Sequence, residues 1–368
     1  MDEFTENAED VEVIYLDEEI DESAELQEVE YNNDQSEPVD VAKVTFTKHS
    51  KSVFCCDLSR DGQIAVTGGE DDNAYVWSTT DGSVVFECTG HKDSVTAVCF
   101  NHNDELLATG DMAGMLQVWS VKEKKLIWCY EGDDMEWLTW HPLTNILLCG
   151  SHSGEVYVWQ VPQGNCKVLT SHGSACTCGQ VLPDGKHLLA GYEDGYVKLW
   201  DLKTATVKWQ FTDSQVNSLE INSDGSLCSL APSSTLLKIN DGKVVGKLVV
   251  EGEPEIEAHV FSSELNLLVT GSLSGQLCVW DLPRQAIRHQ AKLDCGVTIL
   301  KLGLNGKVYI GTTSGVVYVC DVRTGGLVET FTGHKVDILS LCVSQDGLSV
   351  LTTSDDETAK VFVSQSTT

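Results

Sequence analysis

The sequence predicts an all-β protein: an eight-bladed β-propeller that follows a disordered, acidic N-terminal arm. Three observations predict this fold. A strand that ends in an aromatic residue recurs about every 40 residues, short apolar runs alternate with Asp-Gly turns, and residues 1–42 contain no Lys or Arg. The expected domains are therefore the arm, residues 1–42, and the propeller, residues 43–368.

The repeat is clearest in its tryptophans. Five of them are spaced by 42, 40, 41 and 80 residues, and three other residues complete the series at the same interval. In chain order the eight positions are Trp77, Trp119, Trp159, Trp200, Asn240, Trp280, Cys320 and Phe362. A fixed period of this length is typical of propeller blades. We therefore expect eight blades, including a complete one in the degenerate repeat at 209–243.

The segments between these positions read as strands and turns. Runs of five to eight residues alternate with Asp-Gly pairs, as at 61–62 and 184–185, and no segment keeps the 3.6-residue period of a helix. A lone strand at 43–47 should pair with the last strand, 358–363. Closure of the ring in this way removes an exposed strand edge, which would otherwise promote aggregation.

These motifs resemble the WD-repeat family. The Gly-His dipeptide of that family occurs at 90–91 and 333–334, and its Trp-Asp dipeptide occurs at 200–201 and 280–281. The resemblance covers residues 43–368 and implies an eight-bladed WD-repeat β-propeller, in which each repeat corresponds to one four-stranded blade.

Three His–Asp pairs share a separation of 22 residues. They are His49 and Asp71, His172 and Asp194, and His334 and Asp356. In the family such a pair belongs to a buried network with a strand hydroxyl and the tryptophan, so the resemblance implies a structural role and not a catalytic dyad. His91 has Ala113 at the corresponding position. The complete network is therefore expected in three blades.

The charge of the chain favours a basic protein partner. The formal net charge is −32, and the 17 acidic residues of the arm leave −15 for the propeller. Phosphate binding requires clustered Lys and Arg, so direct nucleic-acid binding and anionic membranes are disfavoured, whereas a cationic segment would be attracted. In the arm, the apolar residues at 11–16 are either part of a solvated tail or a short docking motif.

No motif points to catalysis, a cofactor or a metal. The sequence contains no P-loop, nucleophile elbow, dinucleotide fingerprint or His-Glu-x-x-His pattern, so we expect no enzyme activity, no cofactor and no metal. The 14 cysteines lie mostly among apolar strand residues, as is usual for buried thiols in a reducing compartment. With no signal peptide or membrane span in the sequence, we expect a cytoplasmic monomer, with the nucleus as the alternative location.

Binding by a propeller is expected on the loops around its channel mouth. Two positions per repeat should point there, one before the Asp turn and one at the start of the innermost strand, and neither set contains Lys or Arg. The candidate partner-binding residues are Glu70, Asp134, His152, Glu193, Glu255, Asp337 and Asp355. They are either ordinary solvated side chains or a ring that holds a basic peptide. Trp137, near the mouth, is expected either to stack on a cation of that peptide or to be buried between blades.

Several stretches, among them 67–77 and 136–142, resemble one branch of the WD-repeat family more closely than its general consensus. That branch, with members in animals and a relative in fungi, implies two roles. One is chaperoning of a basic large-subunit ribosomal protein, and the other is promotion of cell migration and angiogenesis. The charge agrees with the first, so the expected function is escort of a basic ribosomal protein, and a signalling scaffold is the alternative. Heparin binding is implied as well, but no clustered basic site is visible.

Overall fold

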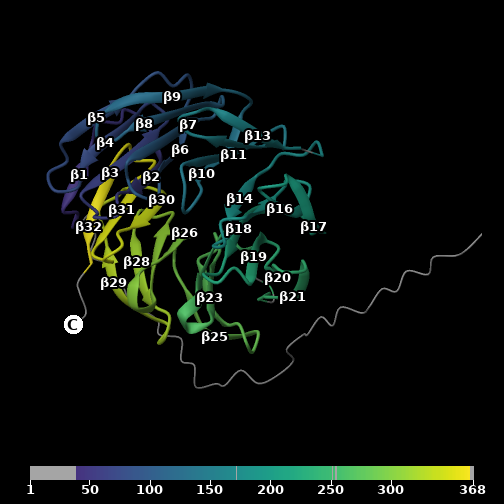
Figure 1. Cartoon of the computed structure of the whole chain (residues 1–368). Helices are drawn as coiled ribbons and strands as arrows, with labels where there is room; N and C mark the ends of the chain where they lie inside the picture. Colours follow the sequence, from purple (N-terminus) through teal and green to yellow (C-terminus); the bar gives the residue numbers. More distant parts are fainter. Residues whose placement is uncertain (1–38, 171, 251, 253–254, 365–368) are drawn as a thin grey trace, which may run out of the picture. The chain divides into compact units, whose positions relative to one another are not determined.

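The computed structural model describes residues 39–170, 172–250, 252 and 255–364. In this part of the chain, 32 strands form eight four-stranded antiparallel sheets, and the only helical elements are two 3-10 turns, η1 Ser263–Leu265 and η2 Leu304–Gly306. The sheets follow one another around a central axis, as the colours of Figure 1 show. The predicted eight-bladed propeller is confirmed. The predicted arm lies outside the described residues up to position 38.

Seven blades are continuous in sequence, and each is written here from its innermost to its outermost strand. Blades 1 to 4 are β2 Val53–Leu58, β3 Ile64–Gly69, β4 Ala74–Ser78 and β5 Val84–Cys88; β6 Val95–Phe100, β7 Leu106–Asp111, β8 Met115–Ser120 and β9 Lys125–Glu131; β10 Met135–Trp140, β11 Ile146–Ser151, β12 Val156–Gln160 and β13 Asn165–Leu169; and β14 Cys178–Val181, β15 His187–Gly191, β16 Tyr196–Asp201 and β17 Thr206–Thr212. Blades 5 to 7 are β18 Val216–Ile221, β19 Leu227–Pro232, β20 Thr235–Lys238 and β21 Lys243–Lys247; β22 Ala258–Ser262, β23 Leu267–Gly271, β24 Gln276–Asp281 and β25 Ala286–Lys292; and β26 Val297–Leu302, β27 Lys307–Thr312, β28 Val317–Asp321 and β29 Gly326–Phe331.

Blade 8 joins the two ends of the propeller. It consists of β30 Ile338–Val343, β31 Ser349–Ser354, β32 Ala359–Val363 and, as its outermost strand, β1 Val44–Phe46. Val44 pairs with Val361 in an antiparallel register, and the first and last colours of the chain meet there in Figure 1. The predicted closure is therefore present, and the outer edge of β32 is covered.

The degenerate repeat forms a complete blade. Strands β18 to β21 pair in order, and Leu236 and Leu237 are buried on the strand that carries tryptophan in most other blades. Apolar side chains at the right register are sufficient for the blade because neighbouring sheets pack face to face and bury both surfaces of the middle strands.

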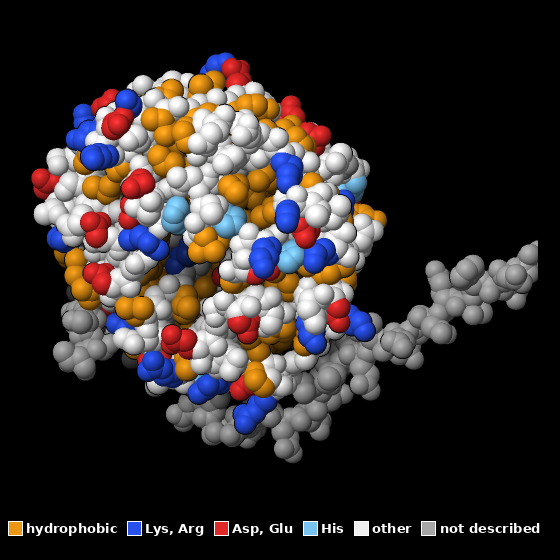
Figure 2. All heavy atoms as spheres, in the orientation of Figure 1, with side chains coloured by type: hydrophobic (Ala, Val, Ile, Leu, Met, Phe, Trp, Pro, Cys, Tyr) orange, Lys and Arg blue, Asp and Glu red, His pale blue; other side chains and the backbone are white. Residues whose placement is uncertain are grey.

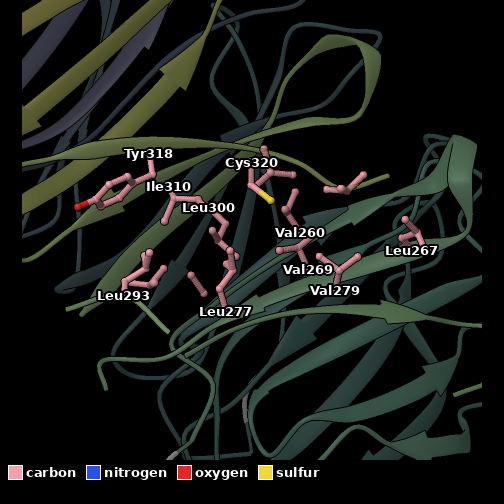
Figure 3. Close-up of a cluster of buried hydrophobic side chains, with 14 residues drawn as sticks. Val260, Leu267, Val269, Leu277, Val279, Leu293, Leu300, Ile310, Tyr318 and Cys320 are labelled. Atoms are coloured by element: carbon pink, nitrogen blue, oxygen red, sulfur yellow. The ribbon is translucent and has the colours of Figure 1, made fainter. Parts of the chain in front are cut away.

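Packing between blades follows the same rule around the ring. In β7 every residue is buried, whereas the outermost strand β9 is mostly exposed or half-buried. Figure 3 shows one interface, where Val269 and Val279 of blade 6 meet Leu300 and Ile310 of blade 7. Each fully buried side chain of this kind contributes about 1.5–3 kcal/mol of hydrophobic stabilisation.

Residues 39–42, assigned to the arm from the sequence, lie against blades 7 and 8. The backbone N–H of Val41 donates to the carbonyl of Thr332 at 3.0 Å. The ammonium of Lys360 forms an ion pair with Asp40 at 2.5 Å. These contacts make residues 39–42 part of the outer wall of the propeller.

Candidate functional site

The predicted binding residues come from two kinds of loop at one end of the ring, here called the top face. One kind joins the second and third strands of a blade, and the other leads from an outermost strand to the next innermost one. Because all strands within a blade are antiparallel, both kinds of loop emerge at the same end. The face of the molecule in Figure 2 is hollowed at its centre, and acidic and basic side chains are interspersed on it.

One group of acidic residues spans blades 8 and 1. The hydroxyl of Ser52 donates to the carboxylate of Asp355, and the backbone N–H of Asp355 donates to the carbonyl of Asp337 at 3.2 Å. The backbone N–H of Glu70 donates to the carbonyl of Ser52 at 2.9 Å. Three predicted residues are thus brought together: Ser52 links Glu70 to Asp355, and Asp355 is bonded to Asp337. We call them the blade 8/1 group.

A second group occupies blade 3 and the adjoining loop of blade 4. The backbone N–H of His152 donates to the carbonyl of Asp134 at 2.8 Å, and its Nδ1 lies 2.8 Å from Oε1 of Glu136. The hydrogen bond and charge of Glu136 raise the pKa of His152, with further contributions from Glu193 and Asp134. Asp134, Glu136, His152 and Glu193 form the blade 3/4 group. The sequence reasoning missed Glu136, although Glu136 stands only two residues after Asp134, at the start of β10.

The other predicted residues are placed apart from these groups. Glu255 is exposed and lines a pocket between blades 5 and 6. Trp137 is half-buried: its indole lies against Gly150 and Gly179 between blades 3 and 4, and its Nε1 is buried. This position agrees with the alternative of packing between blades, although part of the side chain stays accessible.

The top face is less uniformly acidic than the aligned positions indicate. Lys51 stands next to Ser52, which occupies one of the aligned positions, and Lys51 Nζ lies 3.5 Å from Oε1 of Glu70. Lys92 pairs with Glu131 at 2.6 Å. The side chains of both pairs are about half exposed, so each ion pair contributes little to stability. A charged group of a ligand can therefore readily replace either partner.

Three ionisable side chains occupy one register position on innermost strands. They are Asp57 on β2, Glu220 on β18 and Lys301 on β26. Burial raises the pKa of Asp57 to about 6, although it accepts backbone hydrogen bonds from Phe100 and Leu58. Burial also raises the pKa of Glu220 to about 7, against the opposing charge of Lys301. The raised pKa values of these two carboxyl groups make the charge of the inner strands depend on pH near neutrality, which the sequence pattern did not indicate.

Two of the predicted His–Asp pairs form the expected buried network. In blade 1, His49 Nδ1 lies 2.9 Å from Asp71 Oδ1, and Thr67 Oγ1 lies 3.0 Å from His49 Nε2 and accepts from Trp77 Nε1 at 3.2 Å. Because the carboxylate can only accept, Nδ1 is the donor to it and Nε2 accepts from the hydroxyl. Burial would raise the pKa of Asp71, but the hydrogen bonds and charge of His49 and the Ser50 N–H outweigh it and lower the pKa.

Blade 8 has the same arrangement with one substitution. His334 Nδ1 lies 2.9 Å from Asp356 Oδ2, and His334 Nε2 lies 2.8 Å from Thr352 Oγ1. Phe362 stands in the tryptophan position and adds no hydrogen bond, but its ring packs edge-on to His334. The pKa of Asp356 lies well below its usual range, since His334 and Thr358 outweigh the effect of burial.

The expectation that His91 lacks an acidic partner is wrong. Its Nδ1 lies 3.2 Å from Oδ2 of Asp111, and its Nε2 lies 2.8 Å from Oγ1 of Thr109. Asp111 stands 20 residues after His91 instead of 22, at the end of β7. A side chain at that position reaches the same imidazole, so a fixed spacing of 22 residues overlooked it.

The third predicted pair departs from the buried network. His172 uses Nε2 to contact Asp194 at 2.9 Å, and the two side chains are 26% and 40% exposed. The strand hydroxyl is absent because Ala190 stands there, and the bulky Tyr192 fills the space used by glycine in blade 1. His172 Nδ1 instead accepts from the ammonium of Lys198 at 2.8 Å. Complete His–Asp–hydroxyl networks therefore occur in blades 1, 2 and 8.

The part of the chain that the structure describes holds no group of three or more His, Cys, Asp or Glu side chains suited to a metal ion. Among the same residues, no helix is long and apolar enough to cross a membrane. What this surface offers chemically is a set of carboxylates, with a few lysines, hydroxyls and backbone groups among them, on loops held by the blades.

Comparison with known proteins agrees with this architecture. Residues 51–354 match the model of the WD40-like domain. The chain is 40% identical over 350 residues to the angio-associated migratory cell protein of Canis lupus familiaris, covering 89% of this chain and 80% of that protein. It is 25% identical over 392 residues to the ribosome assembly protein SQT1 of Saccharomyces cerevisiae, covering 90% of each. The crystal structure of Chaetomium thermophilum Sqt1 bound to the N-terminus of the ribosomal protein L10 is similar in fold, with a TM-score of 0.80 at 21% identity over 89% of this chain and all of that one.

Proposed function

Since the chain belongs to the WD40-like family and, within it, to the family of angio-associated migratory cell protein, we propose that it is a non-enzymatic propeller that binds a basic segment of a large-subunit ribosomal protein and escorts that protein toward assembly. The observation that carries the proposal is the presence of two carboxylate groups on one face, the blade 8/1 group and the blade 3/4 group.

The physical basis is charge complementarity. Carboxylates at two places on the mouth of a concave ring concentrate the negative potential there and speed the capture of a cationic segment. Arginine in such a segment forms charge-assisted and often bidentate bonds to carboxylates. A segment that reaches both groups gains affinity from each of them, since the second contact is intramolecular once the first has formed.

The similarity to Sqt1 supports the class of ligand. Sqt1 is named a ribosome assembly protein, and a solved structure holds it with the N-terminus of ribosomal protein L10. We propose that this chain takes a ligand of the same class, acts as a monomer and works in the cytoplasm, where ribosomal proteins are made.

The proposal is tested by calorimetric titration of the full-length chain with a Lys/Arg-rich peptide. The triple variant Glu70→Lys, Glu193→Lys and Asp355→Lys should lose binding while the fold remains intact. A matched control is Glu105→Lys, Glu123→Lys and Glu264→Lys, which makes the same change in net charge on loops at the opposite end of the ring. If both triple variants bind as the wild type does, the acidic groups are ordinary solvated surface.

A signalling scaffold is the second candidate, and the observation that favours it is the 40% identity to the angio-associated migratory cell protein, against 25% to SQT1. The name of that relative refers to cell migration. A scaffold of this kind needs no basic ligand, so capture of partners from cytosol by the triple variant would favour it over the escort function.

A further inference from the structure

Four aromatic side chains form one continuous cluster on the outer rim of blades 2 and 3. Trp128 and Tyr130 belong to β9, the outermost strand of blade 2, and Tyr157 and Trp159 belong to β12 of blade 3. The ring centre of Tyr130 lies 6.1 Å from that of Tyr157 and 4.8 Å from that of Trp159. Tyr157 in turn stacks on Trp159, with ring centres 5.2 Å apart. The cluster therefore joins the two blades.

The cluster is buried at one end and accessible at the other. Trp159 is only 2% exposed, whereas Tyr130 and Tyr157 are half-buried. Because β9 ends at Glu131 and β12 begins at Val156, both tyrosines stand at the top end of their strands. The buried indole supports both phenol rings on the side away from the top face, and part of each ring stays accessible.

Two carboxylates border the tyrosine rings and are held by hydroxyl groups. The hydroxyl of Tyr157 donates to Oε2 of Glu155 at 2.7 Å, and Ser153 Oγ donates to Oδ2 of Asp133 at 3.1 Å. Burial raises the pKa of both tyrosines, and neighbouring groups, both carboxylates among them, raise it further. The negative potential of the two carboxylates thus reaches both rings.

The charge at this edge of the top face is negative. Glu131 stands at the end of β9, Asp133 follows it in the next loop, and Glu155 precedes β12. Lys92 pairs with Glu131 at 2.6 Å. Asp133 is exposed and Glu155 is half-buried, so their charges attract an arriving cation.

Aromatic rings beside carboxylates suit a cation, and a guanidinium in particular. The face of an aromatic ring attracts a cation, and a carboxylate forms charge-assisted hydrogen bonds with it. Arginine makes both contacts at once, because its planar group stacks on a ring while its N–H groups form a fork to a carboxylate. The ammonium of lysine is a point charge and has no plane to stack.

We propose that this cluster binds an arginine side chain of a bound protein segment, with the guanidinium stacked on the tyrosine rings and donating to the carboxylates. The residues that form the site are Tyr130, Asp133, Glu155 and Tyr157. The proposal rests on the proposed function, since the arginine belongs to the basic segment, and it specifies the chemistry of one residue of that segment. Asp133 adjoins Asp134 in sequence, so the site continues the blade 3/4 group toward the outer rim.

The direct test titrates the full-length chain with Nα-acetylarginine amide. The aromatic NMR signals of Tyr130 and Tyr157 should shift, and the lysine analogue, of equal charge, should shift them less at the same concentration. Gly132→Ala should abolish the shifts, because its Cβ would lie 2.5 Å from Cε1 of Tyr130 and displace that ring. Gly326→Ala, on the outermost strand of blade 7, is the matched control: its Cβ meets Thr324 Oγ1 at an ordinary 3.5 Å, and the shifts should persist. Unshifted tyrosine signals, or equal shifts with both analogues, would overturn the proposal.

A second test separates this inference from the proposed function. Two peptides of equal length and charge, one with Arg and one with Lys at every basic position, are titrated against the wild type and the double variant Tyr130→Leu, Tyr157→Leu. The Arg peptide should bind the wild type about tenfold more tightly than the Lys peptide, and the double variant should bind both alike. A purely structural role of the cluster would lower the melting temperature of the double variant and leave the preference for arginine in place.

The outcomes for the two proposals differ. If both peptides bind the wild type equally, or if the double variant keeps the preference, the arginine site fails while the proposed function stands. If neither peptide binds the wild type, the proposed function fails, and the titration with Nα-acetylarginine amide decides the site.

Discussion

The imidazole of His91 is hydrogen-bonded to the carboxylate of Asp111, and neither side chain has any exposed surface. The carboxylate also accepts from the backbone N–H groups of Lys92 and Met115. Burial would raise the pKa of Asp111, yet these donors lower it. The pair therefore fixes the loop that enters blade 2 to the end of β7.

Loss of this imidazole should be more costly than loss of the one in blade 4. His91→Ala leaves Asp111 buried with one donor fewer and should lower the free energy of unfolding by about 2–4 kcal/mol. His172→Ala breaks a partly exposed pair and should cost about 1 kcal/mol or less. Thermal melts of the two variants, run side by side, measure the difference. Equal shifts, or a larger one for His172→Ala, would contradict the network described for blade 2.

Glu220 should make stability depend on pH. Its carboxyl titrates at about 7 in the folded chain, above its unfolded value of about 4.3. The native state therefore keeps a proton that the unfolded state releases, and this contribution to stability is present below pH 4 and is lost as pH rises to 7. Glu220→Gln should raise the free energy of unfolding at pH 8 by roughly 1–3 kcal/mol, allowing for partial solvent access. At pH 4 the variant and the wild type should melt alike, and a constant difference across this range would count against the raised pKa.

Closure of the ring should depend on Phe46. Its ring is almost fully buried and stacks on Trp77, with ring centres 4.7 Å apart. Phe46→Ala removes this contact between β1 and blade 1 and should cost about 3–5 kcal/mol. Phe46→Leu keeps most of the volume and should cost clearly less. Chemical denaturation reports the loss, and size-exclusion chromatography reports whether the uncovered β32 edge causes association. An alanine variant as stable as the wild type would show that closure does not depend on this side chain.

The blade count and the closing strand could be predicted because they follow from a period and from strand patterns, both of which are local in sequence. The register of the degenerate blade 5 could also be predicted, since buried leucines replace the tryptophan without changing the alternation of the strand. The partner of His91 could not be found from a fixed spacing. Asp111 reaches the same imidazole from a position two residues earlier, which only the backbone geometry at the end of β7 shows.

The binding site was predictable only in part, for a similar reason. Alignment of the repeats placed Glu70, Asp355 and Asp337 on the same face, but it could not show that Ser52 links Glu70 to Asp355 or that Lys51 lies 3.5 Å from Glu70. Side chains next to the aligned positions determine the local charge, and their direction is not encoded in the period. The same holds for Glu220, whose raised pKa depends on strands brought together by closure of the ring.

Salt should weaken the binding of a basic peptide if the acidic groups are responsible for it. Exposed charges are screened over about 8 Å at physiological ionic strength and over about 3 Å at 1 M. The carboxylates of Asp134, Glu193 and Asp355 are exposed, so their attraction for Lys and Arg is fully subject to this screening. Between 50 mM and 500 mM salt, the affinity should fall by about tenfold or more, mainly through a slower association rate.

The decisive comparison pairs this salt series with the charge-reversal variants. For the wild type and the Glu105, Glu123 and Glu264 control, the association rate measured by surface plasmon resonance should fall steeply with salt. For the Glu70, Glu193 and Asp355 triple variant it should be low at all salt concentrations, because the top face then repels the peptide. A migration scaffold that recognises its partner by shape and apolar contact would instead show the same rate in all three proteins, with little dependence on salt. That result would reject the escort function even if all three proteins bound the basic peptide. Binding at a rate that depends neither on salt nor on the acidic residues does not require the acidic face.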